Sequence, residues 1–245
     1  MLEALLHGKL SHEQENMEDI LTSNVLGSLQ YLPPDQGLLP FVGRAVTASG
    51  EHPLDGLPAD TQASYSFWPW MEETGCSGCE PDLLLDLTLP VDKPILAIVE
   101  AKYLSGKSSE ADETASKPQD QLAREWDNLV CRAGDTFRPI LIYLTADLRF
   151  PASDINDAIS EYTQKRGTSP TICWLSWRHL ASVVCDSDSQ IARALCQMLR
   201  RLDLIFYSGT HPIKDLRPIL WSFQRSPCVF HRRLCVPPIT WSFRS

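Results

Sequence analysis

The chain has 245 residues, 43% of them hydrophobic and 22% charged, which is enough apolar material for one large domain or one domain with a small appendage. The composition is ordinary for a soluble globular protein, and no apolar run is long enough to cross a bilayer. The net charge of −9 is divided unevenly, because residues 1–125 hold 7 Lys/Arg and 21 Asp/Glu whereas residues 126–245 hold 15 and 10.

The first predicted element is a helix from His12 to about Gln30. Its apolar stripe is followed by Pro33-Pro34, which ends a helix. Residues 35–62 carry Gly, Pro and Asp at short intervals, so we expect a loop-rich crossing with one strand near Phe41–Val46.

The next segments predict a sheet. An aromatic strand over Ser64–Trp70 precedes two apolar strands, Pro81–Leu89 and Pro94–Lys102. The short connection around Val91 predicts that these two strands form a hairpin in which Asp82 lies opposite Glu100. Strand side chains alternate with period two, so Glu100 and Lys102 share one face.

The remainder of the chain alternates helices and strands. A polar segment over residues 105–118 predicts a flexible loop. The elements expected after it are, in order, a helix from Gln119 to about Cys131, a strand over Arg138–Leu144, a helix over Ile155–Gln164, a strand over Thr171–Leu175 and a helix over Ser189–Leu202. This order predicts an α/β fold with a mixed central sheet flanked by helices on both faces.

The chemistry of the hairpin rests on two acids and one amine. Asp82 and Glu100 together would attract a hard divalent cation, Mg²⁺ or Mn²⁺, through carboxylate oxygens. Such a cation activates a bound water and neutralises charge on a phosphoryl oxygen. Lys102 could orient or deprotonate that water and stabilise developing negative charge. The set suits hydrolysis of a phosphodiester.

This pattern resembles the PD-(D/E)XK nuclease superfamily, which has the restriction-endonuclease-like fold. The motif stands as Pro81-Asp82 and, eighteen residues after Asp82, Glu100-Ala101-Lys102. The family's core of helix, three-stranded meander, helix and strand matches residues 12–145. The resemblance implies metal binding by Asp82 and Glu100 and a catalytic role for Lys102.

Members of this superfamily also place an acid on the first core helix and a glutamine on the helix after the motif. Glu18 fits the first position as a further metal ligand, with Glu15 as second choice, although acids in a first helical turn also have an ordinary dipole explanation. Gln121 fits the second position as a catalytic residue, and Glu125 lies on the same helix face.

The last forty residues differ from the rest. We divide the chain into a nuclease-like domain, residues 1–205, and a basic, aromatic appendage, residues 206–245. Arg225, Arg232 and Arg233 are its candidate nucleic-acid contacts, since interleaved basic and aromatic residues suit phosphates and bases. The alternative is an appendage packed on the core with its arginines exposed.

Eight cysteines are scattered through the chain, and its core is large enough to be stable without disulfide bonds. The N-terminus has Glu3 where a secretory signal carries positive charge, so we expect a cytoplasmic protein with reduced thiols. Cys173, Cys185 and Cys196 are interpreted as small buried hydrophobes. Cys76 and Cys79 have a zinc-knuckle spacing that would need further ligands from the tail, such as Cys228, His231 and Cys235, and thiols in a loop are the favoured reading.

We therefore expect a metal-dependent endonuclease, acting on DNA because the fold family mostly does. The alternative is a non-catalytic module of the same fold, a partner subunit of a nucleic-acid-processing or defence complex. A zinc-stabilised interaction domain is the third hypothesis. By resemblance the expected partners are nucleic acid and either a second copy of the chain or another protein, with no membrane.

Overall fold

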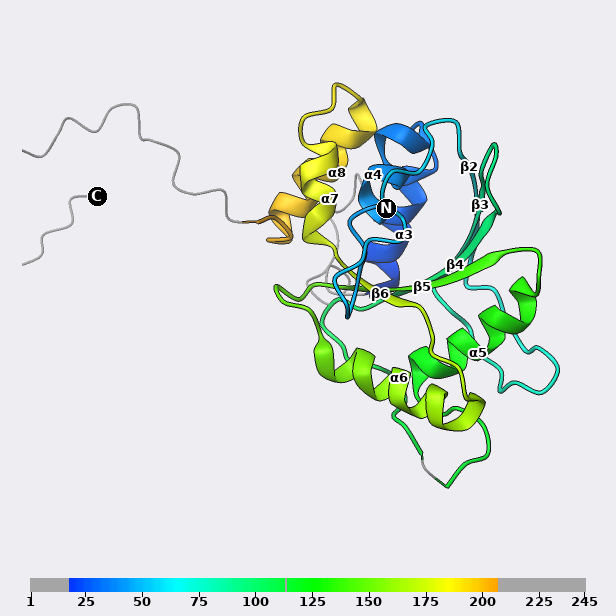
Figure 1. Ribbon diagram of the computed structural model, residues 1–245. Helices are drawn as coiled ribbons and strands as arrows, with labels where there is room; N and C mark the ends of the chain where they lie inside the picture. The colour runs from blue at the N-terminus through cyan, green and yellow to red at the C-terminus, as the bar shows by residue number, and fades with distance from the viewer. Residues whose placement is uncertain (1–17, 113, 207–245) are drawn as a thin grey trace, which may run out of the picture. The chain divides into compact units, whose positions relative to one another are not determined.

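The computed structural model describes residues 18–112 and 114–206, which form a three-layer α/β unit. Its centre is a six-stranded mixed sheet of order β1-β6-β5-β4-β3-β2 (Figure 1). The strands are β1 (Val46–Thr47), β2 (Gln62–Phe67), β3 (Leu83–Thr88), β4 (Ile95–Ala101), β5 (Arg138–Thr145) and β6 (Ile172–Ser176).

Helices cover both faces of the sheet (Figure 1). On one face lie α3 (Glu18–Leu29), α4 (Leu38–Val42), α7 (Arg178–Val184) and α8 (Gln190–Arg201); on the other lie α5 (Gln121–Ala133) and α6 (Ala152–Arg166). A single 3-10 turn, η1 (Pro34–Gln36), precedes α4. None of the described helices is both long and apolar enough to cross a membrane.

The central strands are apolar along their whole length because both of their faces are covered. Every residue of β4 is buried, and β4 pairs with β5 in parallel. Strand β3 instead alternates buried and partly exposed side chains, since it lies nearer the edge. The two faces of the sheet thus carry two separate apolar clusters, one under each helical layer.

The β3–β4 hairpin has the register that its turn predicts. Leu83 pairs with Val99, which leaves Asp82 and Glu100 as the next residues outward along the two strands. Beyond the end of β4, the Lys102 amide donates to the Leu144 carbonyl at 2.7 Å and prolongs the pairing with β5. The acidic residues are thereby fixed at one end of the sheet by backbone pairing on two sides.

Helix α5 begins where a good capping residue stands. The Asp120 carboxylate accepts hydrogen bonds from the amides of Leu122 at 3.0 Å and Ala123 at 3.3 Å. The first helical residue is therefore Gln121, beside the end of β4. The predicted helix after the motif is confirmed, with its start two residues later than expected.

Two expectations about the face of α3 are corrected. The strand predicted near Phe41–Val46 is wrong for most of its length, because Leu38–Val42 forms helix α4 and only Val46–Thr47 pairs, with β6. Helix α7 was not predicted. A short apolar run is compatible with either a buried strand or a buried helix.

A disulfide joins Cys185, which caps α7, to Cys196 on α8. The expectation that these two are reduced, small buried hydrophobes is therefore wrong. Cys173 is free and buried on β6, as predicted. Spacing alone did not reveal the bond because the two cysteines meet only when α8 folds back on α7.

Candidate functional site

Six polar side chains converge at the end of β4, and five of them come from the predicted motif and its helix. Asp82, Glu100, Lys102, Gln121 and Glu125 are all buried, although charged side chains seldom are. Glu18, at the described start of α3, is partly exposed and completes the group. Sheet, hairpin and two helices from opposite layers thus meet at one place.

Lys102 links the acids of this group. Its Nζ lies 2.6 Å from Glu100 Oε1 and 3.2 Å from Glu18 Oε1. Burial lowers the pKa of Lys102, but the two carboxylates outweigh it and the net pKa is raised. Lys102 is therefore an ammonium in this state, a donor of hydrogen bonds and positive charge.

Asp82 is oriented by two donors. Oδ2 accepts from the Ala101 amide at 2.8 Å, and Oδ1 accepts from the indole Nε1 of Trp68 at 3.2 Å. Loss of water and then the charge of Glu100 raise the pKa of Asp82 to about 7. The carboxyl is thus poised to take up either a proton or a cation near neutral pH.

Gln121 bridges Glu100 and Glu125, the two most buried acids of this group. Its amide nitrogen donates to Glu100 Oε1 and, at 3.1 Å, to Glu125 Oε1. The other end of the amide is fixed, because Gln121 Oε1 accepts from the Ser108 amide at 2.7 Å. The orientation of the side chain therefore follows from the loop that precedes α5.

Glu100 and Glu125 each have one buried oxygen, Oε2, that accepts no hydrogen bond from the described residues unless the two carboxyls share a proton. Burial raises the pKa of both carboxyls, and the negative charge of Glu100 raises the pKa of Glu125 further. Two neighbouring buried carboxylates need either a proton on one of them or a cation between them. The two Oε2 atoms mark the place that such a proton or cation would occupy.

A divalent cation at this place would be held by fewer than three carboxylate, imidazole or thiolate side chains of the described residues. In the described part of the chain, no three His, Cys, Asp or Glu side chains surround a common point. Glu18, proposed as a ligand, has Oε2 bonded to the Tyr103 amide at 2.9 Å and to the Ser105 hydroxyl, and Oε1 bonded to Lys102. Mg²⁺ commonly takes one or two carboxylates and completes its shell with water. Asp82 and Glu100 supply that number.

Sequence reasoning missed the residues that position the site. Trp68 orients Asp82, Ser108 orients Gln121, and Ser105 contacts Glu18. Ser105 and Ser108 lie in the loop over residues 105–118, which was expected to be flexible. Its described residues form no helix or strand, but Lys107, Lys165 and Glu161 hold them in place through ion pairs and bonds to the backbone.

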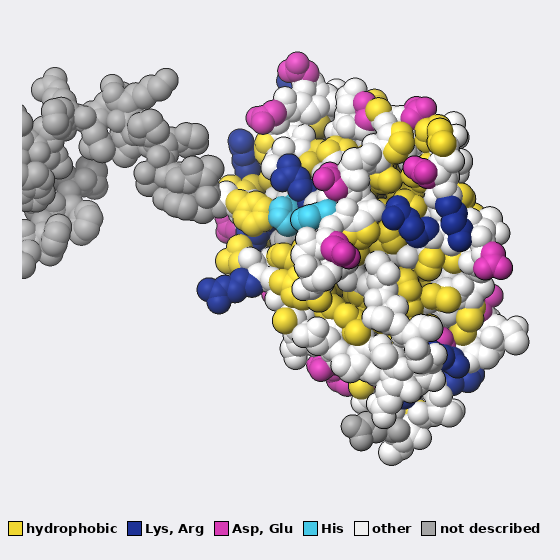
Figure 2. All heavy atoms as spheres, viewed as in Figure 1, with side chains coloured by type: hydrophobic (Ala, Val, Ile, Leu, Met, Phe, Trp, Pro, Cys, Tyr) yellow, Lys and Arg dark blue, Asp and Glu magenta, His cyan; other side chains and the backbone are white. Residues whose placement is uncertain are grey.

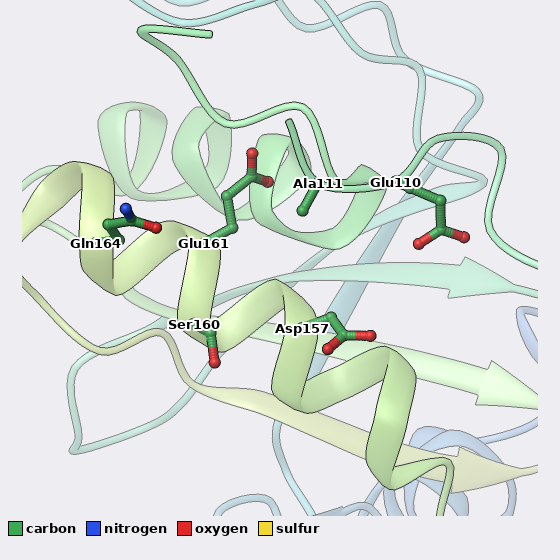
Figure 3. Close-up of a pocket in the computed structure, with 6 residues that line it drawn as sticks. All are labelled: Glu110, Ala111, Asp157, Ser160, Glu161 and Gln164. Atoms are coloured by element: carbon green, nitrogen blue, oxygen red, sulfur yellow. The ribbon is translucent and has the colours of Figure 1, made fainter. Parts of the chain in front are cut away.

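A hollow lies between this loop and α6, and the acid in it serves to hold the loop. Glu161 faces the loop across it, while Ala111 and Glu110 form the opposite wall (Figure 3). The Glu161 carboxylate is fully used, since it accepts from the amides of Asp112, Gln119 and Asp120 and from Lys165. This acid holds the loop and leaves no free oxygen for a ligand.

The remaining predicted sites are placed as follows. Arg225, Arg232 and Arg233, with the tail residues Cys228, His231 and Cys235, lie outside the described residues, as does Glu15. Cys76 and Cys79 are buried, and the Cys76 thiol lies 3.4 Å from that of Cys131 on α5. On the face shown in Figure 2, Lys and Arg side chains are scattered among Asp and Glu.

Comparisons with protein-family models, curated proteins and solved structures found no match to this chain. The geometry of the acids, the lysine and the glutamine is therefore the ground on which a function can be proposed.

Proposed function

We propose that the protein is a Mg²⁺- or Mn²⁺-dependent endonuclease with a restriction-endonuclease-like core, and that it hydrolyses phosphodiester bonds of DNA. The observation that carries the proposal is that Asp82, Glu100 and Lys102 lie buried at one end of a hairpin. The Oε2 atom of Glu100 accepts no hydrogen bond from an N–H group there. The succession of α3, the β2–β3–β4 meander, α5 and β5 supports the same assignment.

Each residue has a role that its contacts allow. Asp82 and Glu100 would hold the cation, which when bound supplies a more acidic water and charge neutralisation at a phosphoryl oxygen. Lys102, as an ammonium, donates hydrogen bonds to the reacting phosphate and stabilises its developing negative charge. Gln121 keeps Glu100 in place through its amide.

One observation favours the non-catalytic alternative, a binding module or partner subunit. Lys102 is already paired with two carboxylates, so the group could be a buried ion-pair network that only shapes the fold. A network of that kind gains nothing from Mg²⁺, whereas a nuclease site is stabilised by a ligand that binds the folded state. Metal titration of the thermal unfolding midpoint separates the two.

The nuclease proposal is tested with two single variants. Asp82→Asn keeps the shape of the side chain and removes its charge, and Lys102→Met removes the ammonium. We expect cleavage of plasmid and oligonucleotide DNA in Mg²⁺ to fall by about 100-fold or more in each. Asp92→Asn, in the exposed turn of the same hairpin, is the matched control and should cleave normally. Wild-type rates in folded Asp82→Asn would refute the proposal, and RNA run in parallel decides between the two nucleic acids.

A further inference from the structure

Two exposed tryptophans follow the end of edge strand β2: Trp68, which lies against Asp82, and Trp70, two residues further along the chain. The side chain of Trp68 is 38% exposed and that of Trp70 is 63% exposed, although tryptophan is usually well buried. Trp68 orients Asp82 through its indole nitrogen, whereas Trp70 has no role in the metal chemistry proposed above. Their exposure beside a buried site calls for a ligand.

Trp68 is held against Asp82 at a cost. Its backbone has φ +47°, in the left-handed region that bulky residues rarely adopt because the conformation is strained. The backbone amide of Trp68 donates to the Asp82 carbonyl at 3.1 Å, and its indole Nε1 donates to the Asp82 carboxylate. The strained turn therefore fixes the ring as one wall of a hollow that Asp19, Glu80 and Asp82 complete.

Trp70 is equally well supported, although most of it faces solvent. Its ring lies on the backbone of Gly78, where an added Cβ would come within 2.5 Å of a ring carbon. The loop that presents Gly78 is closed by two backbone bonds of 2.8 Å between Met71 and Cys79. Glycine at position 78 is thus required for the ring to rest there, and the exposed ring is pre-organised.

The acidic residues around the Trp68 ring restrict what can bind next to it. Asp19, Glu80 and Asp82 line the hollow, so phosphate groups are repelled from it except where a bound cation neutralises them. An uncharged, flat group avoids that repulsion and gains from stacking on an indole. In a duplex the bases are already stacked inside and the phosphates face outward, so a duplex would present the repelled groups to this surface.

We propose that Trp68 and Trp70 form a stacking subsite for unpaired nucleobases next to the scissile phosphate. The substrate class is then DNA with unpaired nucleotides at the cleavage point, as in single strands, flaps or frayed ends. This inference rests on the proposed nuclease function, and it adds the specificity that the acids and the lysine alone do not provide. Stacking on one aromatic side chain contributes about 1–3 kcal/mol per base.

The experiment compares cleavage of a single-stranded oligonucleotide and its duplex by Trp70→Ala, Trp70→Phe and wild type in Mg²⁺. We expect Trp70→Ala to raise KM for the single strand by about 5- to 100-fold with little change in kcat, and Trp70→Phe to retain most of the binding. Tyr31→Ala removes another ring that is 73% exposed and is the control, with no expected effect.

Two outcomes would overturn the subsite: an unchanged KM for the single strand in Trp70→Ala, or an equal loss on the duplex. If wild type cleaves neither substrate, the nuclease proposal fails by itself, and quenching of tryptophan fluorescence by an oligothymidylate in Ca²⁺ still tests stacking. Quenching that Trp70→Ala weakens supports the subsite. Absence of quenching rejects it and leaves a protein partner as the ligand of the rings.

Discussion

At the scale of single residues, the site is defined by carboxyls that have lost water without gaining enough donors. Asp82 has one backbone donor and one indole donor, and Glu100 and Glu125 each keep a bare oxygen. Burial therefore raises the pKa of all three carboxyls when no cation is present, that of Asp82 to about 7. Proton and cation compete for the same oxygens, which makes pH a probe of the site.

We predict that stabilisation by Mg²⁺ grows as pH rises from about 6 to about 8. The pKa of Asp82 is raised from its ordinary 3.8 to about 7, so between these values the folded state binds more protons than the unfolded state. Its contribution to stability is thus fully present below the unfolded pKa and is lost as pH rises through about 7. Mg²⁺ restores stability above that pH, where the carboxylate is free.

Thermal unfolding measured with and without Mg²⁺ across this pH range checks the prediction. Asp82→Asn cannot titrate at this position, so its metal-free stability should fall less with rising pH, and its response to Mg²⁺ should be small. A Mg²⁺-induced shift of the unfolding midpoint that is larger at about pH 6 than at about pH 8 would contradict the assignment of Asp82.

At the scale of elements, the hairpin register could be predicted and the positioning contacts could not. The period of two and the turn at Val91 place Asp82 beside Glu100, and Leu83 pairs with Val99 accordingly. The bond from Trp68 to Asp82 depends on a left-handed turn that the aromatic pattern does not signal. Local pattern reports which face a residue occupies, and it does not report which distant loop returns to that face.

The loop before α5 shows the same limit. Its composition predicts a mobile segment, yet Lys107 is buried and paired with the equally buried Asp120, the cap of α5. Lys107 also donates to the Asp154 carbonyl at 3.2 Å. The partners lie on elements that the sequence separates from the loop, so composition alone could not reveal them. The pair fixes the loop whose Ser108 amide orients Gln121.

We predict that Lys107→Met lowers the free energy of unfolding by about 3–5 kcal/mol, because it leaves the buried Asp120 carboxylate without its cation. The double variant Lys107→Met/Asp120→Asn should recover part of that loss, since the uncompensated charge is gone. Lys93→Met, in the exposed hairpin turn, is the control. Denaturant unfolding measures all three, and a loss below about 1 kcal/mol in Lys107→Met would reject a structural role for the pair.

At the scale of the whole molecule, the described residues are acidic, with 15 Lys/Arg against 26 Asp/Glu in residues 18–112 and 114–206. Attraction of a polyanion by such a body is weak without a cation at the site. The helical layers on both faces of the sheet contribute residues to the site. Helix α5 brings Gln121 and Glu125 from one layer, while Glu18 comes from α3 in the layer that contains the disulfide.

We predict that removing this disulfide weakens the fold and spares the metal site. In Cys185→Ala/Cys196→Ala the loop between the two cysteines, 11 residues apart, is no longer cross-linked. The chain-entropy model then expects the free energy of unfolding to fall by about 2–4 kcal/mol. The bond joins α7 to α8, whereas Asp82 and Glu100 are fixed by the pairing of β3, β4 and β5. The unfolding midpoint should therefore fall in the double variant while the Mg²⁺-induced increment stays as in wild type. A lost increment in a folded double variant would show that the layer of α3 and α8 is needed to assemble the site, and that Glu18 has a larger part in it than Lys102 pairing alone.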